Sequence, residues 1–484
     1  MGLEHDNGCA AGDSGTTETR IAMRLSTRMP DRSDVDRFPQ LRTNPNLPCM
    51  LSISLCASIS EAGKYSSAWP PLAKRTGVLA FALALSACGQ APSTDQSITS
   101  NYTHDVRPGI DILLSDSSHL IDGRRVGLIT NRSGVGRDGT SSIDILYTYP
   151  RTNLVALFAP EHGIRGSQPE GIEIPDTVDP STGIPIYSLY GKTRAPTEKM
   201  LEGIDVLVFD LQDIGARYYT YQSTMALAMK AAGREKMPFV VLDRPNPLGG
   251  AVNGPTLNPA FASFVGPYPI PVRHGMTVGE LAHLFTGEFN IEVDLHVVPT
   301  MGWTRNLWFD DTGLVWVPPS LNMPSLESAT HYPGTCLFEG TNFSVGRGTT
   351  EAFQLLGSPW LDGALWAERL VDYNLPGVRI EISEFTPQDP SDGKFDGVTM
   401  TGIRLVVTNR TSYDPVLTAV AALIEARRLS GKAWVWNKRH FDRLAGYDGL
   451  RLAIDRGDEL ENIVEAWINE RSEFKGLRRP YLMY

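Results

Sequence analysis

The stretch LVALFAPEHG, residues 154–163, combines the two features that decide the fold of this chain. Its first half, residues 154–158, is an uninterrupted apolar run, which is typical of a strand buried on both faces. The run ends in a proline that is followed by Glu161, His162 and Gly163. Ligands of open α/β sheets bind just beyond the carboxyl ends of the strands. We therefore predict that Glu161 lies at the centre of a functional site.

Similar apolar runs alternate along the chain with segments of helical periodicity. Strands are predicted at residues 125–130, 206–209 and 239–242, and helices at residues 142–149 and 221–234. Apolar strands that alternate with helices are typical of a parallel sheet with helices on both faces. The sequence therefore predicts an α/β fold whose first domain is a Rossmann-like parallel-sheet domain.

Polar residues follow each of these predicted strands. Because the carboxyl ends of parallel strands meet at one edge of the sheet, we expect these side chains to line a common cleft. They are Asn131 and Arg132 after the first strand, Glu161 and His162 after the second, Asp210 and Asp213 after the third, and Asp243, Arg244 and Asn246 after the fourth.

The character of the chain changes between residues 255 and 350, where proline, glycine and aromatic residues form long loops. Loops of this length usually carry function, and aromatic side chains beside polar ones suit the apolar faces and hydroxyl edges of sugars. Strands near residues 378–382 and 402–407 and a helix over residues 415–428 then predict a second, smaller α/β unit. The predicted boundaries are residues 105–260 for the Rossmann-like domain and 261–484 for the second α/β domain with its long site loops.

The composition argues against several classes of function. The formal net charge is −11 and no basic arm is present, so we expect no nucleic-acid partner, because that affinity comes mainly from Lys and Arg on phosphates. Four of the five cysteines lie in the first 88 residues, and Cys336 is the one that lies in the predicted folded part. We therefore expect neither disulfides nor a cysteine-based zinc site there.

The N-terminal region has the features of an export signal. Residues 1–73 lack periodicity, which predicts either a disordered extension or a start codon assigned too early. Residues 74–88 combine Lys74 and Arg75 with a short apolar run. This arrangement is typical of a secretory signal peptide, and the run is too short to span a bilayer.

The end of this signal resembles a bacterial lipoprotein box, Leu85-Ser86-Ala87-Cys88. The resemblance implies that Cys88 is lipidated and becomes the new N-terminus. Residues 89–104 are polar and suit a tether between a membrane anchor and a folded domain. We therefore predict an exported, membrane-anchored lipoprotein that faces the periplasm. The alternative is an ordinary signal peptide followed by an incidental cysteine.

A glycine-rich loop at residues 134–139 formally matches the GxGxxG motif of dinucleotide-binding proteins, and Glu161 lies 22 residues after Gly139. In that motif the third glycine belongs to the helix that packs on the strand. Here Gly139 is followed by Thr140-Ser141-Ser142, which are typical helix-capping residues. The loop is therefore interpreted as an ordinary connection, and a nucleotide-dependent enzyme is a weaker alternative.

Asp210 and Asp213 place two carboxylates three residues apart at one strand end. They could hold sugar hydroxyls, orient Arg217 or bind a metal, and structural pairing explains them equally well. The chain has no His-x-x-His motif or dense Asp cluster. We therefore predict neither a metal nor an organic cofactor.

A second glycine-rich segment, residues 337–350, carries Glu339 and Arg347. An arginine there could bind a carboxylate through two parallel hydrogen bonds. The segment lacks the GxxxxGK[ST] pattern of a phosphate loop, and Ser344 lacks the GxSxG pattern of a serine hydrolase. His274 is an isolated histidine. The sequence is equally compatible with a packing role and with a role in the site for this residue.

These motifs together resemble one family, the exo-β-N-acetylmuramidases of the NamZ type, formerly the domain of unknown function DUF1343. The resemblance extends from about residue 105 to Tyr484 and is weaker after Gly397. The matching motifs are PEHGIRG (160–166), YSLYG (187–191), FDLQDIG (209–215), DRPNP (243–247), RHGMT (273–277), YPGT (332–335), EGTN (339–342) and GRGT (346–349).

The resemblance implies hydrolysis of the β-glycosidic bond of N-acetylmuramic acid at the non-reducing ends of peptidoglycan fragments. It implies that the active site lies in the cleft between the two domains and that Glu161 is the catalytic acid and base. Glycosidases usually pair two carboxyl groups, about 5–5.5 Å apart when retaining and about 6.5–9.5 Å apart when inverting. Glu339 or Asp210 is the candidate partner, unless the 2-acetamido group of the substrate is the internal nucleophile.

The predicted partners are peptidoglycan fragments and, through Cys88, a membrane. Arg347 or Arg273 is the predicted ligand of the lactyl carboxylate, and Asn342 the predicted ligand of sugar hydroxyls. A non-catalytic peptidoglycan-binding lipoprotein with the same cleft is the main alternative. The full set of predicted substrate-binding residues is His162, Asp213, Arg244, Asn246, Arg273, His274, Asn322, Asn342 and Arg347.

Overall fold

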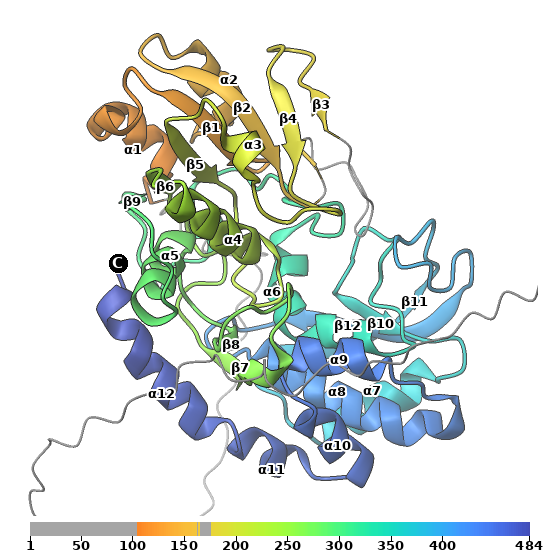
Figure 1. Ribbon diagram of the computed structural model, residues 1–484. Helices are drawn as coiled ribbons and strands as arrows, with labels where there is room; N and C mark the ends of the chain where they lie inside the picture. The colour runs from red at the N-terminus through yellow and green to blue at the C-terminus, as the bar shows by residue number, and fades with distance from the viewer. Residues whose placement is uncertain (1–103, 162, 165–175) are drawn as a thin grey trace, which may run out of the picture. The chain divides into compact units, whose positions relative to one another are not determined.

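A computed structural model describes residues 104–161, 163–164 and 176–484 of the chain (Figure 1). The predicted signal peptide, Cys88 and His162 lie outside these residues, so the predictions made for them stay predictions. Within the described ranges, no helix is both long and apolar enough to cross a membrane.

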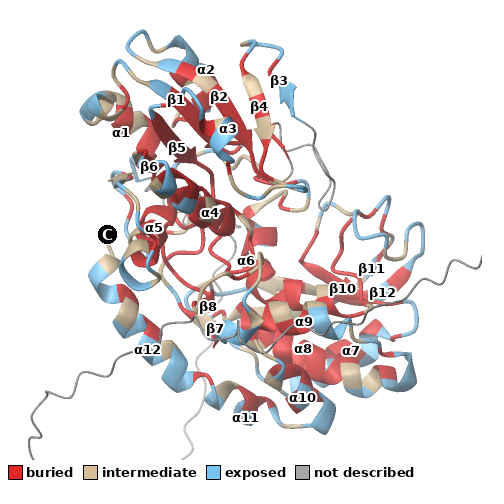
Figure 2. Cartoon of the chain, in the orientation of Figure 1, coloured by how far each residue is buried: buried red, intermediate tan, exposed pale blue. Residues whose placement is uncertain are grey.

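The larger sheet has seven strands in the order β3-β4-β2-β1-β5-β6-β9. All neighbouring strands are parallel except β3 and β4, which are antiparallel. The apolar runs at its centre are buried, as Figure 2 shows. The strands are β1 (Arg125–Thr130), β2 (Asn153–Ala159), β3 (Thr177–Val178), β4 (Pro185–Ser188), β5 (Val206–Asp210), β6 (Phe239–Leu242) and β9 (Leu295–Val298).

Helices cover both faces of this sheet because successive strand residues point to opposite faces. Leu128 and Val208 pack into one core with α1 and α2, whereas Ile129 and Phe209 pack into another with α4 and α5. The helices of this part are α1 (Gly109–Asp116), α2 (Ser142–Thr148), α3 (Glu198–Leu201), α4 (Tyr221–Arg234) and α5 (Val278–Glu288).

The smaller sheet has three antiparallel strands in the order β10-β12-β11. Its strands are β10 (Leu355–Gly357), β11 (Val378–Phe385) and β12 (Met400–Val407). Helix α7 (Gly363–Val371) packs against β11 and β12, and α8 (Pro415–Ser430) packs against α7. A two-stranded ribbon, β7 (Asn253–Thr256) and β8 (Pro271–Arg273), precedes this part of the chain. The other helices are α6 (Leu326–Thr335), α9 (Lys438–Ala445), α10 (Gly449–Arg456), α11 (Leu460–Glu465) and α12 (Ile468–Arg478).

The two sheets share a continuous apolar core, in which Phe209 of β5 and Ile403 of β12 belong to the same cluster of buried side chains. The chain then returns to the larger sheet at its end. Tyr484 Oη donates a hydrogen bond of 2.6 Å to Asp243 Oδ2, just beyond β6. The last residue is therefore anchored at the carboxyl edge of the larger sheet.

The predicted fold class is confirmed, with a largely parallel α/β sheet and a second, smaller α/β part. The boundary predicted between residues 260 and 261 stays a prediction. The larger sheet takes its last strand, β9, from beyond that position, because residues 295–298 pair in parallel with β6.

Candidate active site

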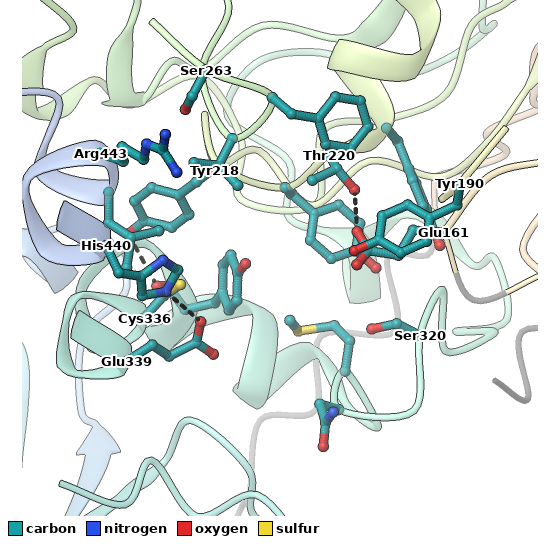
Figure 3. A pocket seen from close by; sticks show the side chains of 18 of the residues that line it. Glu161, Tyr190, Tyr218, Thr220, Ser263, Ser320, Cys336, Glu339, His440 and Arg443 are labelled. Carbon is teal, nitrogen blue, oxygen red and sulfur yellow. Dashed lines mark hydrogen bonds and ion pairs between the residues drawn. The ribbon is translucent and has the colours of Figure 1, made fainter. Parts of the chain in front are cut away.

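A cavity of about 570 Å³ lies where segments of both parts of the chain meet (Figure 3). Glu161, the segment before α4 and the loop at residues 262–265 line it from the first part. Residues after α6 and on α9 line it from the second. Its volume is within the range of pockets that bind small ligands.

Glu161 reaches this cavity through a sharp turn after β2. Gly163 N donates a hydrogen bond of 3.0 Å to Pro160 O, and Gly163 has a φ of 74°. A positive φ of this size strains any residue with a Cβ, which explains the glycine two residues after the glutamate. The turn lifts Glu161 off the strand axis into the cavity wall.

Thr220 fixes one oxygen of the Glu161 carboxylate. Its Oγ1 donates a hydrogen bond of 2.7 Å to Glu161 Oε2. Thr220 occupies the N-cap position of α4, where a threonine hydroxyl usually accepts from the helix backbone, but its side chain caps nothing here. The hydroxyl is therefore used to orient Glu161.

Glu339 is the second carboxylate of the cavity, and it is bound by Arg347 and lies beside His440. Arg347 donates to Glu339 Oε1 from Nε and Nη2, at 3.1 and 2.6 Å, and His440 Nε2 lies 3.8 Å from Oε2. Burial alone would raise the pKa of Glu339, but Arg347 and His440 outweigh it and hold this pKa at about 2. Glu339 is therefore ionised at neutral pH.

The two carboxylates face the same cavity from different walls. Figure 3 shows Glu161 and Glu339 on opposite sides of it, with Tyr190 beside Glu161 and Tyr218 on the side of His440 and Glu339. Tyr218 is fixed by a hydrogen bond of 2.6 Å from its Oη to Pro333 O. Aromatic walls with a few fixed polar groups are the usual lining of a site for a sugar-sized ligand.

Arg217 joins the two walls. Its guanidinium is fully buried and donates to Pro255 O and Ile270 O, both at 3.0 Å, and to Leu444 O at 2.6 Å. Because Leu444 belongs to α9, Arg217 ties the tyrosine-rich segment before α4 to the helix that carries His440. The suggestion that Asp210 or Asp213 orients this arginine has no contact to support it in the described residues.

Four of the predicted site residues line the cavity together. They are Glu161, Glu339, Arg347 and Asn322, and Asn322 Nδ2 donates a hydrogen bond of 2.9 Å to Ser391 Oγ. Arg347 Nη1 donates to the same hydroxyl at 3.1 Å. The structure thus brings the second glycine-rich segment to Glu161, although the two are far apart in the sequence.

Asp210 does not line this cavity, and the prediction that it is the partner of Glu161 is not supported. Its side chain is fully buried, and Arg244 Nε and Nη2 donate to its two oxygens at 2.6 and 2.9 Å. Arg244 also donates to Val135 O at 2.9 Å. Asp210 at the end of β5 and Arg244 after β6 therefore pair with each other rather than line the cavity.

Asp213, His274 and Asn246 also form internal contacts away from the cavity. Asp213 Oδ2 accepts a hydrogen bond of 2.8 Å from Gly215 N and lies 3.7 Å from His274 Nε2. Asn246 Nδ2 donates to Met276 O at 2.9 Å. These contacts stabilise the turns that follow β5 and β6.

Arg273 and Asn342 hold loops in place. Arg273 is buried and donates to Asn253 Oδ1 at 3.1 Å and to Leu248 O. Asn342 Oδ1 accepts from Val435 N at 3.0 Å. Neither side chain lines the cavity, so the structure does not support their predicted contacts with a lactyl carboxylate or with sugar hydroxyls.

The GxGxxG loop closes on itself, as predicted for an ordinary connection. Gly136 N donates to Thr140 O at 2.8 Å, and Ser142 N donates to Gly134 O at 2.8 Å. Ser141 is the N-cap residue of α2, and its side chain accepts from the helix backbone. These backbone donors are therefore already paired within the loop.

Several residues of the cavity carry no motif that sequence reasoning detects. Tyr218, Thr220 and Tyr221 belong to the run YYTY, and such a run just before a helix and just after a strand is the one local signal that marks them. His440 and Arg443 come from α9, about a hundred residues after Glu339, and only packing places them here. Within the described ranges, no group of three or more His, Cys, Asp or Glu side chains is arranged to hold a metal ion.

Comparison with known proteins identifies the family. The N-terminal model of the exo-β-N-acetylmuramidase NamZ family matches residues 126–327, and the C-terminal model matches residues 330–484. The chain belongs to this family. The resemblance seen in the sequence motifs is thereby confirmed, and Glu161 and Glu339 lie in the N-terminal and C-terminal NamZ regions, respectively.

Relatives support the assignment over the whole folded part. The chain is 44% identical over 411 residues to the peptidoglycan β-N-acetylmuramidase NamZ of Bacillus subtilis (strain 168), a match that covers 84% of this chain and 98% of the relative. Crystal structures of two DUF1343 family proteins from Bacteroides fragilis are similar, with TM-scores of 0.73 and 0.64 at 35% and 31% identity. Each of these two matches covers 78% of this chain and 99% of the other.

Proposed function

We propose that this protein is an exo-acting glycoside hydrolase that releases N-acetylmuramic acid from the non-reducing ends of peptidoglycan fragments. One observation carries the proposal: the N-terminal and C-terminal NamZ regions each supply one carboxylate, Glu161 and Glu339, to a single cavity. The name of the Bacillus subtilis relative gives the same activity on the same polymer.

The size and lining of the cavity suit the end of a glycan chain. A volume of about 570 Å³ accommodates a small ligand rather than a long polymer segment. Aromatic side chains cover the apolar faces of a pyranose ring, and the carboxylates and hydroxyls between them meet its polar edges. A terminal sugar residue is therefore the unit that this cavity recognises.

Glu161 is assigned as the general acid and base. In the first step the carbonyl oxygen of the substrate's 2-acetamido group bonds to C1 while the bond from C1 to the glycosidic oxygen breaks. Glu161 gives its proton to the glycosidic oxygen, which leaves with the bonding electron pair. In the second step water attacks C1, the bond from C1 to the acetamido oxygen breaks, and Glu161 accepts the proton of the water. Thr220 holds Oε2 throughout and leaves Oε1 to face the substrate.

Glu339 is assigned to binding and electrostatic stabilisation. Its Oε1 already accepts two hydrogen bonds from Arg347, and its low pKa keeps it anionic. An oxygen engaged in this way is a weak nucleophile, so we assign Glu339 to hold the polar groups of the sugar, including the 2-acetamido N–H. The developing positive charge of the transition state is stabilised by the same anion.

Hydrolysis of two substrates tests the activity. The full-length protein should release 4-nitrophenol from 4-nitrophenyl β-N-acetylmuramide and free N-acetylmuramic acid from the disaccharide in which that sugar is linked to N-acetylglucosamine. Early digests of longer glycans should contain the monosaccharide. Binding of muropeptides without turnover would instead identify a non-catalytic binding protein, and early release of oligosaccharides would identify an endo-acting enzyme.

We also propose that the protein is exported and anchored to a membrane through a lipid on Cys88, with the folded part facing the periplasm. The support is in the sequence: basic residues, an apolar run and Leu85-Ser86-Ala87 directly before the cysteine. Labelling of bacteria with a radioactive fatty acid should mark the protein and place it in the membrane fraction. The Cys88→Ser variant should lose both properties, and labelling of that variant would contradict the proposal.

A further inference from the structure

Helix α9 brings two basic side chains into the cavity. His440 and Arg443 are three positions apart, which places them on the same face of the helix, and both line the cavity. His440 lies beside Glu339. The contact between His440 and Glu339 does not involve Arg443, so it does not explain why Arg443 lies in the cavity wall.

The other charges of the cavity are accounted for by partners. Arg347 is bound to Glu339, and Arg194 is exposed and lies over the ring of Phe264, 4.4 Å from its centroid. Asp442, the carboxylate next to Arg443 in sequence, is bound by Arg451 through two contacts of 2.8 Å.

Arg443 is half-buried, and no ion pair or hydrogen bond of its guanidinium is found in the described part of the chain. A basic residue in the last turn of a helix stabilises the helix through the macrodipole. That effect explains a basic residue at position 443 but not a guanidinium directed into a binding cavity. Arg439, on the same helix, shows the contrast because it is exposed and does not line the cavity.

An unpaired hydroxyl accompanies Arg443. The Oγ atom of Ser263 is buried and has no hydrogen-bond partner within the described residues, although Ser263 lines the cavity. Figure 3 shows Ser263 and Arg443 on the same side of the cavity. A buried hydroxyl without a partner is uncommon, and a ligand that accepts its hydrogen bond accounts for it.

We propose that Arg443, assisted by Ser263, binds the lactyl carboxylate of N-acetylmuramic acid and so determines the specificity of the enzyme. The inference rests on the proposed function and adds the residue that selects the substrate. N-acetylmuramic acid differs from N-acetylglucosamine by a lactyl ether on O3, and the carboxylate is the charged end of that ether. A guanidinium binds a carboxylate through two parallel charge-assisted hydrogen bonds, and a hydroxyl completes such a site.

The test compares an acid with its amide. Binding of free N-acetylmuramic acid and of its lactyl carboxamide is measured by isothermal titration calorimetry with the full-length protein, and kcat/KM is measured with the two corresponding 4-nitrophenyl β-glycosides. The variants are R443Q, R443K and S263A. R439Q removes the same charge from an exposed position of α9 and is the matched control.

R443Q should weaken binding of the acid and lower its kcat/KM by about 10- to 100-fold, the range expected for a hydrogen-bonded charge pair. In the same variant, the affinity and the kcat/KM for the carboxamide should stay within about 3-fold of wild type, which corresponds to about 0.7 kcal/mol. R443K should give intermediate values because it keeps the charge but not the paired geometry. S263A should lower the affinity and the kcat/KM for the acid by a smaller factor than R443Q does. R439Q should have the affinity and kcat/KM of the wild type.

Equal losses for acid and carboxamide in R443Q would overturn the proposal, because they would indicate a structural role. No loss for either compound would also overturn it. Wild-type binding of the acid without turnover would reject the proposed hydrolase activity, and the binding measurements would still decide the role of Arg443. Failure of the wild type to bind the acid more tightly than the carboxamide would reject the carboxylate site itself.

Discussion

The hydroxyl of Thr220 and the carboxylate of Glu161 are joined by a hydrogen bond of 2.7 Å. The bond connects the turn after β2 with the N-cap residue of α4, and the two residues are 59 positions apart in the sequence. It leaves one oxygen of Glu161 directed by the protein and the other for a substrate. The position of the catalytic carboxylate therefore depends on the packing of α4 as well as on the turn that carries it.

The first prediction concerns this contact. Thr220→Val keeps the shape of the side chain but removes the donor, so Glu161 loses its orientation. We expect kcat to fall about 10- to 100-fold, as for small misplacements of catalytic groups, with little change in KM. Thr220→Ser retains the hydroxyl and should keep most of the activity. A rise in KM at constant kcat would contradict a role in orienting Glu161.

The second prediction separates Asp210 from the chemistry. Asp210→Ala leaves the buried guanidinium of Arg244 without its partner and should lower the free energy of unfolding by about 3–5 kcal/mol. The kcat of the folded fraction should stay close to wild type, because Asp210 does not line the cavity. The double variant D210L/R244M should recover stability. A loss of kcat as large as that of a Glu161 variant, without loss of stability, would assign Asp210 to catalysis after all.

The third prediction concerns pH. The pKa of Glu339 in the folded protein, about 2, lies below its ordinary value of 4.5. Its ionised form therefore stabilises the fold by an amount that is fully present above about pH 4.5 and is lost as the pH falls towards 2. The shift corresponds to a contribution on the order of 3 kcal/mol.

Urea unfolding of wild type and Glu339→Gln at several pH values checks this contribution. The wild type should be the more stable of the two at pH 7. The difference should shrink as the pH is lowered from about 5 to 3, the interval in which Glu339 takes up a proton in the unfolded chain while it stays ionised in the folded protein. A difference that stays constant over this interval would show that the ion pair with Arg347 does not hold the pKa of Glu339 low.

The parts of the fold that the sequence predicts are those with continuous apolar runs. β1, β2, β5 and β6 are buried on both faces, so their residues are almost all apolar and mark the strands directly. β9 contains a histidine and is only partly buried, and β3 is two exposed residues. The sequences of such edge strands have only a weak apolar pattern. Their place in the sheet is set by pairing with a neighbouring strand, which their own sequence does not reveal.

The candidate site shows a similar division. Glu161 is predictable because it follows a buried strand directly, and Glu339 because it lies in a glycine-rich motif. The structure does not bring Arg244 to the cavity, where the sequence predicts it to bind substrate. A shared sheet edge does not distinguish a side chain that faces a ligand from one that pairs with Asp210. His440 and Arg443 are missed because the packing of α9 against the residues 336–340 brings them in, and no local pattern reports that packing.

Proton transfer by Glu161 in glycoside hydrolysis is tested by the kcat of Glu161→Gln on 4-nitrophenyl β-N-acetylmuramide. Glutamine keeps the size of the side chain and cannot exchange the proton. We expect kcat to fall by about 10²- to 10⁴-fold, with retained binding of N-acetylmuramic acid and an unchanged Tm. Glu202→Gln, an exposed substitution on the same part of the chain, should keep wild-type activity. A kcat of Glu161→Gln close to that of wild type would contradict the account.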